Sequence, residues 1–183
     1  LTQGFSIQLS QYYGAKDFEN LRKSLAHSYR LTAFIAAGVL ILSQSFASLV
    51  LTGLHTPSNI IGMSLLYLRI IFCGIPATAA YNMFASALRA MGNSKTPLTA
   101  MIIASVLNVS LDILFVAGFG WGVAGAAIAT VIAQSFSAVY CFLILRRIDI
   151  VHLTRADFIP ASGMNARLMK LGIPVVFQNI IIG

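Results

Sequence analysis

Two polar side chains that could handle a cation lie inside a long apolar run. Asn108 and Asp112 interrupt residues 98–118, and a helix would place them one turn apart on one face, with Ser105 continuing the stripe. At about 1.5 Å per residue the run covers roughly 30 Å, the thickness of a bilayer's hydrocarbon core, and Asp112 would lie roughly 9 Å inside its boundary at Gly118. Acids at such depth usually face a bundle interior or a water-filled cavity, so the pattern predicts a cation-handling site.

A second span would present a small and polar face to this site. Residues 60–88 form a run longer than a span needs, and Pro76 follows Gly74 within it. Because proline removes a backbone donor, we expect a bend there, with Gly74 and Pro76 as the candidate hinge. One face at i, i+4, i+7, i+11 and i+15 carries Tyr67, Ile71, Gly74, Thr78 and Asn82. Such faces also serve helix packing, which is the alternative interpretation.

A third polar face lies in the uncharged run of residues 122–145. Thr130, Gln134 and Ser137 follow i, i+4 and i+7. The preceding Gly118–Gly122 turn is so short that this helix must be an antiparallel neighbour of the previous one. Thr130 would lie about 12 Å from the outer end. We therefore expect its hydroxyl beside the carboxylate of Asp112.

Arg69 offers the main structural alternative, an ion pair with Asp112 at a similar depth. Arg69 is two residues from Tyr67 and therefore about 200° around the helix from the polar face. Its long side chain can also reach an interface by snorkelling. If the Tyr67 face meets Asp112, Arg69 points elsewhere unless Pro76 distorts the helix. The pair remains open from the sequence alone.

The composition is that of an integral membrane protein. Hydrophobic residues make up 58% of the 183-residue chain and charged residues only 9%. Fifteen of the charged residues fall in segments 16–30, 89–95 and 146–170, and this alternation is the positive-inside pattern that places those segments in the cytoplasm. The basic residues thus set topology, and nothing indicates nucleic-acid binding. The cysteines and histidines show no metal-ligand spacing, so we expect no structural metal or cofactor.

These runs predict an all-α polytopic bundle. Residues 1–145 form one transmembrane bundle, in which 18–30 is a short interfacial helix before the span at 31–51. Residues 146–170 are a cytoplasmic linker, and 171–183 begin another span. The chain starts at Leu1 and stops inside an apolar run, so we expect it to be a fragment.

The order of short motifs resembles one transporter family. Residues 74–97 contain a Gly-x-Pro helix followed by ALRA-x-GN-x-x-TP, residues 107–112 read LN-x-x-LD, and residues 120–130 read G-x-G-x-x-GAA-x-AT. SQ-x-x-GA-x-D at residues 10–17 and LGIP at 171–174 extend the match over nearly the whole chain. The chain resembles the multidrug and toxic compound extrusion (MATE) transporters.

The resemblance implies two six-helix lobes around a central cavity, with this chain covering the first lobe without its first helix, the lobe linker and the start of helix seven. It also implies a multi-pass protein of a prokaryotic cell membrane, with no enzymatic activity. The activity would be multidrug efflux of small organic cations by antiport against H⁺ or Na⁺. The family's cation site falls by motif position on Asp112, Asn108, Asn82, Thr130 and Tyr67. Of these, Asp112, Asn108 and Thr130 would suit Na⁺.

The sequence departs from the family pattern at two positions, and three other functions are alternatives to drug export. Some members have a second asparagine on the fourth helix, and this chain has Ala85 at that position. The aspartate that the family carries on its first helix lies outside the chain. The sequence therefore does not identify the coupling ion. A related flippase for lipid-linked oligosaccharide would need basic residues in its cavity, which are nearly absent here. A membrane scaffold would make Asp112 dispensable. A membrane enzyme would need Ser, His and Asp at one depth, and the sequence shows no such set.

Overall fold

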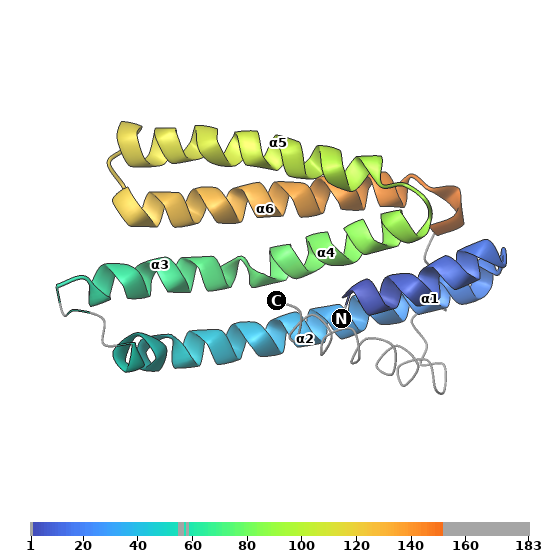
Figure 1. Ribbon diagram of the computed structural model, residues 1–183, viewed down its shortest axis with the longest axis horizontal. Coiled ribbons are helices and arrows are strands. Elements are labelled where there is room, and N and C mark those ends of the chain that lie inside the picture. Colours follow the sequence, from blue (N-terminus) through green and yellow to red (C-terminus); the bar gives the residue numbers. More distant parts are fainter. Residues whose placement is uncertain (1, 55–56, 58, 152–183) are drawn as a thin grey trace.

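The computed structural model describes residues 2–54, 57 and 59–151 (Figure 1). In chain order its elements are α1 (Thr2–Gly14), α2 (Phe18–Gly53), α3 (Ile61–Cys73), α4 (Ile75–Ala90), α5 (Lys95–Asp112), the π-helical turn η1 (Ile113–Gly118), α6 (Gly122–Arg146) and the 3₁₀ turn η2 (Asp149–Val151). These described residues contain no strand, which confirms the predicted all-α bundle. Most of the predicted linker and all of the final span lie outside them.

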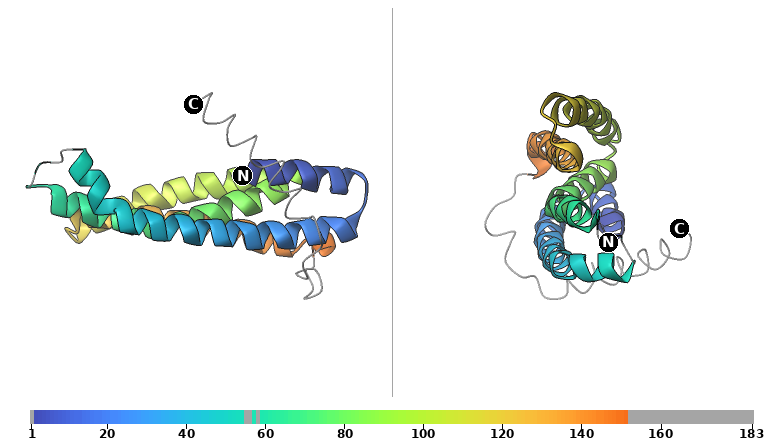
Figure 2. Two further views of the ribbon diagram at one scale, coloured as in Figure 1. Left: turned by 90° about the horizontal axis from the view of Figure 1, so that it is seen from below. Right: turned by 90° about the vertical axis from the view of Figure 1, so that its left-hand side faces the viewer.

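The helices form an elongated bundle in which sequence neighbours lie side by side. Figures 1 and 2 show α5 at one edge, α6 beside it, the α3/α4 pair next and α2 at the other edge, with α1 against α2 and α4. The α1–α2 and α4–α5 connections and the end of α6 lie together at one end, which we call the basic end because it carries the charged loops. The end of α2, the start of α3 and the α5–α6 connection lie at the opposite end.

Four helical segments of the described part are long and apolar enough to cross a bilayer. They are 18–53, 61–90, 95–118 and 122–146, with 36, 30, 24 and 25 residues. At 1.5 Å per residue each exceeds the roughly 30 Å of a hydrocarbon core. Many large apolar side chains, such as Phe34 and Val106, are exposed, as expected where lipid rather than water surrounds a bundle.

The predicted interfacial helix at 18–30 is wrong. The structure continues it into the span as a single 36-residue helix, α2. Leu21 and Leu25 of this segment are buried in a core with Phe5 and Leu9 of α1 and Leu88 of α4. Because partner helices bury this apolar face, the segment extends the bundle at its basic end and does not lie on a membrane surface.

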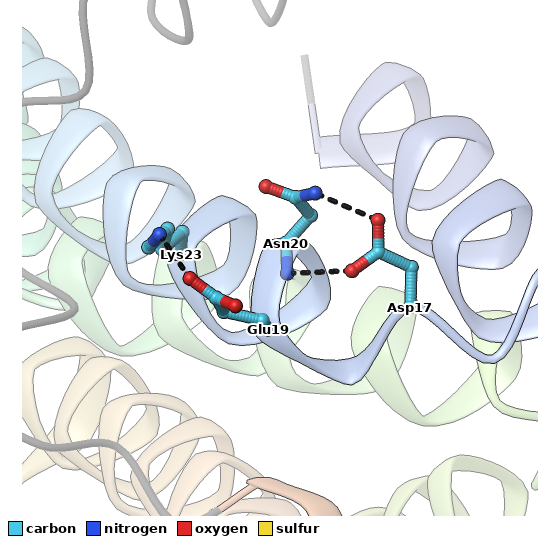
Figure 3. Close-up of polar contacts among 4 residues, drawn as sticks. All are labelled: Asp17, Glu19, Asn20 and Lys23. Carbon is cyan, nitrogen blue, oxygen red and sulfur yellow. Dashed lines mark hydrogen bonds and ion pairs between the residues drawn. The ribbon is translucent and has the colours of Figure 1, made fainter.

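Asp17 caps α2 at the basic end. Its carboxylate accepts hydrogen bonds from the side chain (2.7 Å) and the backbone N–H (3.2 Å) of Asn20, while Lys23 pairs with Glu19 at 2.6 Å one turn further on (Figure 3). These contacts satisfy a backbone donor that the first turn would leave free. The Asn20 side-chain amide, then its backbone N–H, hold the pKa of the Asp17 carboxyl below its ordinary value, and Lys23 adds to this.

Replacing this cap gives a pH-dependent prediction. A lowered native pKa means that the carboxylate stabilises the fold above its unfolded-state pKa, and that this contribution is lost as pH falls through the native pKa. We expect Asp17→Ala to lower the thermal unfolding temperature of the detergent-purified full-length protein at pH 7, with the deficit shrinking in acid. Asp17→Ser, which keeps an acceptor, should show the smaller deficit. An Asp17→Ala deficit that is equal at all pH values would contradict this role.

The predicted bend at Gly74 and Pro76 is confirmed. α3 ends at Cys73, α4 begins at Ile75, and Pro76 occupies the first turn of α4, where its missing N–H costs no helical bond. A β-carbon on Gly74 would lie only 3.0 Å from the Ile71 carbonyl oxygen and from Val131 Cγ2 of α6. Glycine therefore permits both the break and the close approach of α6.

The predicted single helix over 98–118 is only partly confirmed. The α-helix ends at Asp112, and Ile113–Gly118 continue as a π-helical turn. Phe115 in this turn packs against Phe119 and Trp121, with ring centroids 6.0 and 5.0 Å apart. Gly125 of α6 lies so close that an added β-carbon would be 3.0 Å from Phe115 Cβ. Apolar spacing does not distinguish a π-turn from an α-turn, so the sequence did not predict it.

Candidate cation site

A polar pocket of about 370 Å³ lies between α4, α5 and α6. Its lining residues are Thr78, Tyr81 and Asn82 of α4, Met101, Ala104, Ser105 and Asn108 of α5, and Thr130, Ala133, Gln134 and Ser137 of α6. The three polar faces predicted from helical periodicity therefore converge at one place. The small residues Ala104 and Ala133 leave the space that these side chains surround.

Hydrogen bonds across the pocket join the three helices. Asn108 Nδ2 on α5 donates to Thr130 Oγ1 on α6 at 3.4 Å, and that hydroxyl donates to the Ala126 carbonyl at 3.0 Å. Thr78 Oγ1 on α4 donates to Gln134 Oε1 on α6 at 2.7 Å. Asn108 makes this hydrogen bond through its amide nitrogen. Its side-chain carbonyl oxygen can act as an acceptor or as a cation ligand.

Asp112 lies one helical turn from Asn108 and is not part of the pocket lining. Its Oδ1 atom is buried and has no hydrogen-bond partner within the described residues. The expected contact with Thr130 is not formed, because the Thr130 hydroxyl pairs with Asn108 and with its own helix. A buried carboxylate oxygen without a donor is costly, and such groups call for an explanation by a bound ion, a proton or a change of conformation.

The proposed ion pair with Arg69 is absent. In the described part of the chain no ion pair joins Arg69 and Asp112; Arg69 is exposed, and its carbonyl accepts a hydrogen bond from Gln44 of α2 at 2.9 Å. The main structural explanation for the intramembrane carboxylate is thereby removed.

Tyr67 lies apart from the other candidates. It is on α3, 36% exposed, beyond the break at Gly74 and outside the pocket lining. The structure thus brings Asn82, Asn108 and Thr130 together but leaves Tyr67 and Asp112 outside the pocket. The prediction treated 67 and 82 as one continuous helical face, whereas the break at Gly74 interrupts that helix.

Tyr81 is a pocket residue that the sequence analysis did not select. Its hydroxyl donates to the Pro97 carbonyl at 3.2 Å and so connects α4 to the first turn of α5. Tyr81 lies three residues after Thr78 on α4, and this i, i+3 spacing could have identified it.

The oxygen-rich lining suits a hard cation or a hydrated proton. The side chains of Asn82, Asn108, Thr130 and Gln134 supply amide and hydroxyl oxygens, and hard cations prefer oxygen ligands. Clusters of three or more His, Cys, Asp or Glu side chains do not occur in the described ranges.

The fold and the pocket define a multi-pass membrane protein of the helical-bundle class. A family model described as MatE matches residues 1–114, so the chain belongs to the MatE family of membrane transporters. Members of this family are transporters and not enzymes.

Two curated bacterial relatives are similar over most of this chain. The probable multidrug resistance protein YpnP of Bacillus subtilis (strain 168) is 32% identical, over 95% of this chain and 39% of YpnP. The multidrug export protein MepA of Staphylococcus aureus (strain NCTC 8325 / PS 47) is 24% identical, over 98% of this chain and 40% of MepA. The chain thus spans about two fifths of the length of these relatives.

Solved structures of MATE transporters share the fold. The inward-facing and outward-facing conformations of a multidrug resistance MATE family transporter of the MOP superfamily align with TM-scores of 0.88 and 0.86. Each is 24% identical and covers 94% of this chain, whereas the chain covers 40% and 39% of them. The alignments thus cover nearly all of the chain, and at this identity they show a shared fold.

Proposed function

We propose that the whole protein exports small organic cations by antiport against H⁺ or Na⁺, with Asp112, Asn108, Asn82, Thr130 and Tyr67 as its coupling residues. The observation that carries this proposal is the buried Oδ1 of Asp112, which has no hydrogen-bond partner among the described residues and lies inside a membrane-length helix. Intramembrane carboxylates without a structural partner mark ion pathways. The names of YpnP and MepA support drug export.

The pocket lies next to the turn of α5 that carries the carboxylate. A proton or Na⁺ in the pocket would meet the oxygens of Asn108 and Thr130, and Asn108 is one turn from Asp112, about 6 Å along the axis of α5. The π-turn that follows Asp112 supports this assignment, because π-helical turns occur frequently at functional sites. Ion binding would satisfy Asp112 and favour one conformation of the bundle over another.

The break at Gly74 is the hinge in this proposal. α3 and α4 are separate helices, so α3 with Tyr67 can move relative to Asn82 without unwinding a turn. Such a movement would bring Tyr67 towards the pocket when an ion binds. A ligand shifts a conformational equilibrium only if it binds one state more tightly than the other. The five coupling residues would bind the ion more tightly in one conformation of the bundle.

The proposal is tested with the full-length protein in proteoliposomes. Efflux of a fluorescent organic cation is followed after imposing an inward proton gradient, an inward sodium gradient, or neither. We expect one gradient to accelerate efflux and thereby to identify the coupling ion. Equal rates under all three conditions would contradict antiport.

A further inference from the structure

A short hydrogen bond joins α4 to α6 beside the helix break at Gly74. Thr78 Oγ1, four residues after Gly74, lies 2.7 Å from Gln134 Oε1 of α6. Other side-chain hydrogen bonds that join the helices around the polar pocket are 3.2, 3.4 and 3.5 Å long. The bond between Thr78 and Gln134 is therefore the shortest of these links, and it lies within about one turn of the candidate hinge.

The Gln134 side chain also lies directly against the break. A β-carbon added to Gly74 would be 3.1 Å from Gln134 Oε1 and 3.0 Å from Cγ2 of Val131, one turn earlier on α6. Figure 1 shows α6 alongside both α3 and α4, and it packs against both. Because α3 and α4 are separate helices, the contacts that α6 makes at the break decide how freely one moves relative to the other.

The Thr78 hydroxyl has two acceptors within reach. Gln134 Oε1 lies at 2.7 Å, and the Gly74 carbonyl oxygen, four residues earlier in the chain, lies at 3.2 Å. A hydroxyl carries one hydrogen and donates to one acceptor at a time. Donation to the carbonyl four residues earlier recurs in this bundle, as in Thr99 and Ser135 at 3.0 and 2.7 Å. The Thr78 hydroxyl can thus link α4 to α6 or donate within its own helix.

Both partners of this bond line the polar pocket, which connects the choice of acceptor to ion binding. Thr78 and Gln134 share that lining with Asn108 and Thr130. Hard cations prefer oxygen ligands, including amide oxygens. A cation bound at Gln134 Oε1 would repel the positively polarised hydrogen that Thr78 directs at the same oxygen. An ion in the pocket therefore disfavours the link to α6 and favours donation to the Gly74 carbonyl.

We propose that Thr78 and Gln134 are positioning residues that form an ion-sensitive latch on the hinge. With no ion bound, their hydrogen bond holds α6 against the break. A hard cation in the pocket, Na⁺ or a hydrated proton, takes Gln134 Oε1 as a ligand, and the Thr78 hydroxyl turns to the Gly74 carbonyl. α3 then moves more freely relative to α4. This inference rests on the proposed function and explains how ion binding reaches the hinge.

The first test follows the hinge in the full-length protein. Spin labels are attached to Met63→Cys on α3 and Val139→Cys on α6, two positions with more than half of the side chain exposed. Cys73 and every other cysteine that reacts with the label are replaced by serine. Pulsed electron paramagnetic resonance measures the distance between the labels without Na⁺ at high pH, with saturating Na⁺, and at low pH without Na⁺. We expect one of the two ions to shift the distances in the parent.

Variants of the latch show whether the bond causes this shift. Thr78→Val keeps the shape of the side chain and removes the hydroxyl, so its ion-free distances should resemble those of the ion-bound parent. Gln134→Leu should behave in the same way, whereas Thr78→Ser keeps the hydroxyl and should respond as the parent does. A full ion-dependent shift in Thr78→Val would overturn the latch, and so would a parent whose distances neither ion changes.

The second test is a double-mutant cycle on transport. Thr78→Val and Gln134→Leu should each lower gradient-driven efflux of a fluorescent organic cation about tenfold, the factor that corresponds to one lost hydrogen bond. Because both variants remove the same link, the double variant should also lose about tenfold, whereas independent residues would lose about 100-fold together. The control is Thr99→Val, which removes an exposed hydroxyl bonded to its own helix and should transport normally.

The outcomes separate the latch from the proposed function. Losses that multiply in the double variant, or normal efflux in both single variants, would overturn the latch while antiport by the parent stands. Efflux by the parent that no gradient drives would contradict antiport. The spin-label distances still test the latch in that case, because they require ion binding but no transport.

Discussion

Asp112→Asn is expected to reduce ion-driven efflux about 100-fold or more, the size of effect seen when a proton-transferring group is lost. Asparagine keeps the size and one oxygen of the side chain but can neither release a proton nor attract a cation with a full charge. Because Oδ1 has no hydrogen-bond partner in the described residues, the substitution breaks no such contact at that atom. We therefore expect the thermal unfolding temperature to be unchanged or higher.

The control for this variant is Ser110→Ala on the same helix. Ser110 is exposed, and its hydroxyl donates to the Val106 carbonyl of its own helix at 2.8 Å. It should transport at the rate of the parent. An Asp112→Asn protein that is folded and retains gradient-driven efflux would make Asp112 dispensable for coupling and would contradict its assignment as the coupling residue.

Gly74→Ala is expected to destabilise the fold by roughly 1–3 kcal/mol, the usual cost of overpacking. The new methyl would lie 3.0 Å from the Ile71 oxygen and from Val131 Cγ2, and 3.1 Å from Gln134 Oε1. The backbone oxygen cannot move without disturbing α3, so α6 must shift and the 2.7 Å bond between Thr78 and Gln134 must lengthen. Thermal or denaturant unfolding of the full-length protein measures the loss.

Gly62→Ala is the matched control, because it lies in the same predicted span and its added β-carbon meets nothing within 4 Å. Alanine has the higher helix propensity, so this variant should be as stable as the parent or slightly more stable. Equal stability of the two alanine variants would show that α6 does not depend on a glycine at position 74.

Helical periodicity was sufficient to predict the three faces that form the pocket. Asn82, Asn108 and Thr130 were selected from spacing and depth, and the structure brings them together. The short turn before Gly122 correctly indicated antiparallel neighbours, because a tight hairpin permits no other arrangement. These features follow from local rules that act within one helix or one turn.

The errors concern properties that depend on neighbouring helices. The segment around Leu21 and Leu25 has the composition of an interfacial helix, and only the packing of α1 shows that it is buried. The π-turn after Asp112 carries Phe115, which lies against Gly125 of α6, and no spacing rule predicts that contact. Tyr67 was placed with Asn82 because a continuous helix was assumed across Gly74.

The most direct test of the central claim is the count of coupling ions displaced when substrate binds. Detergent-purified full-length protein is preloaded with protons at low pH or with radioactive sodium. A saturating concentration of an organic cation is then added, and the released protons or sodium ions are measured. The account predicts about one ion released per molecule of the parent and none from Asp112→Asn, because that carboxylate holds the ion. Equal release from both proteins would contradict the assignment of Asp112 as the coupling residue.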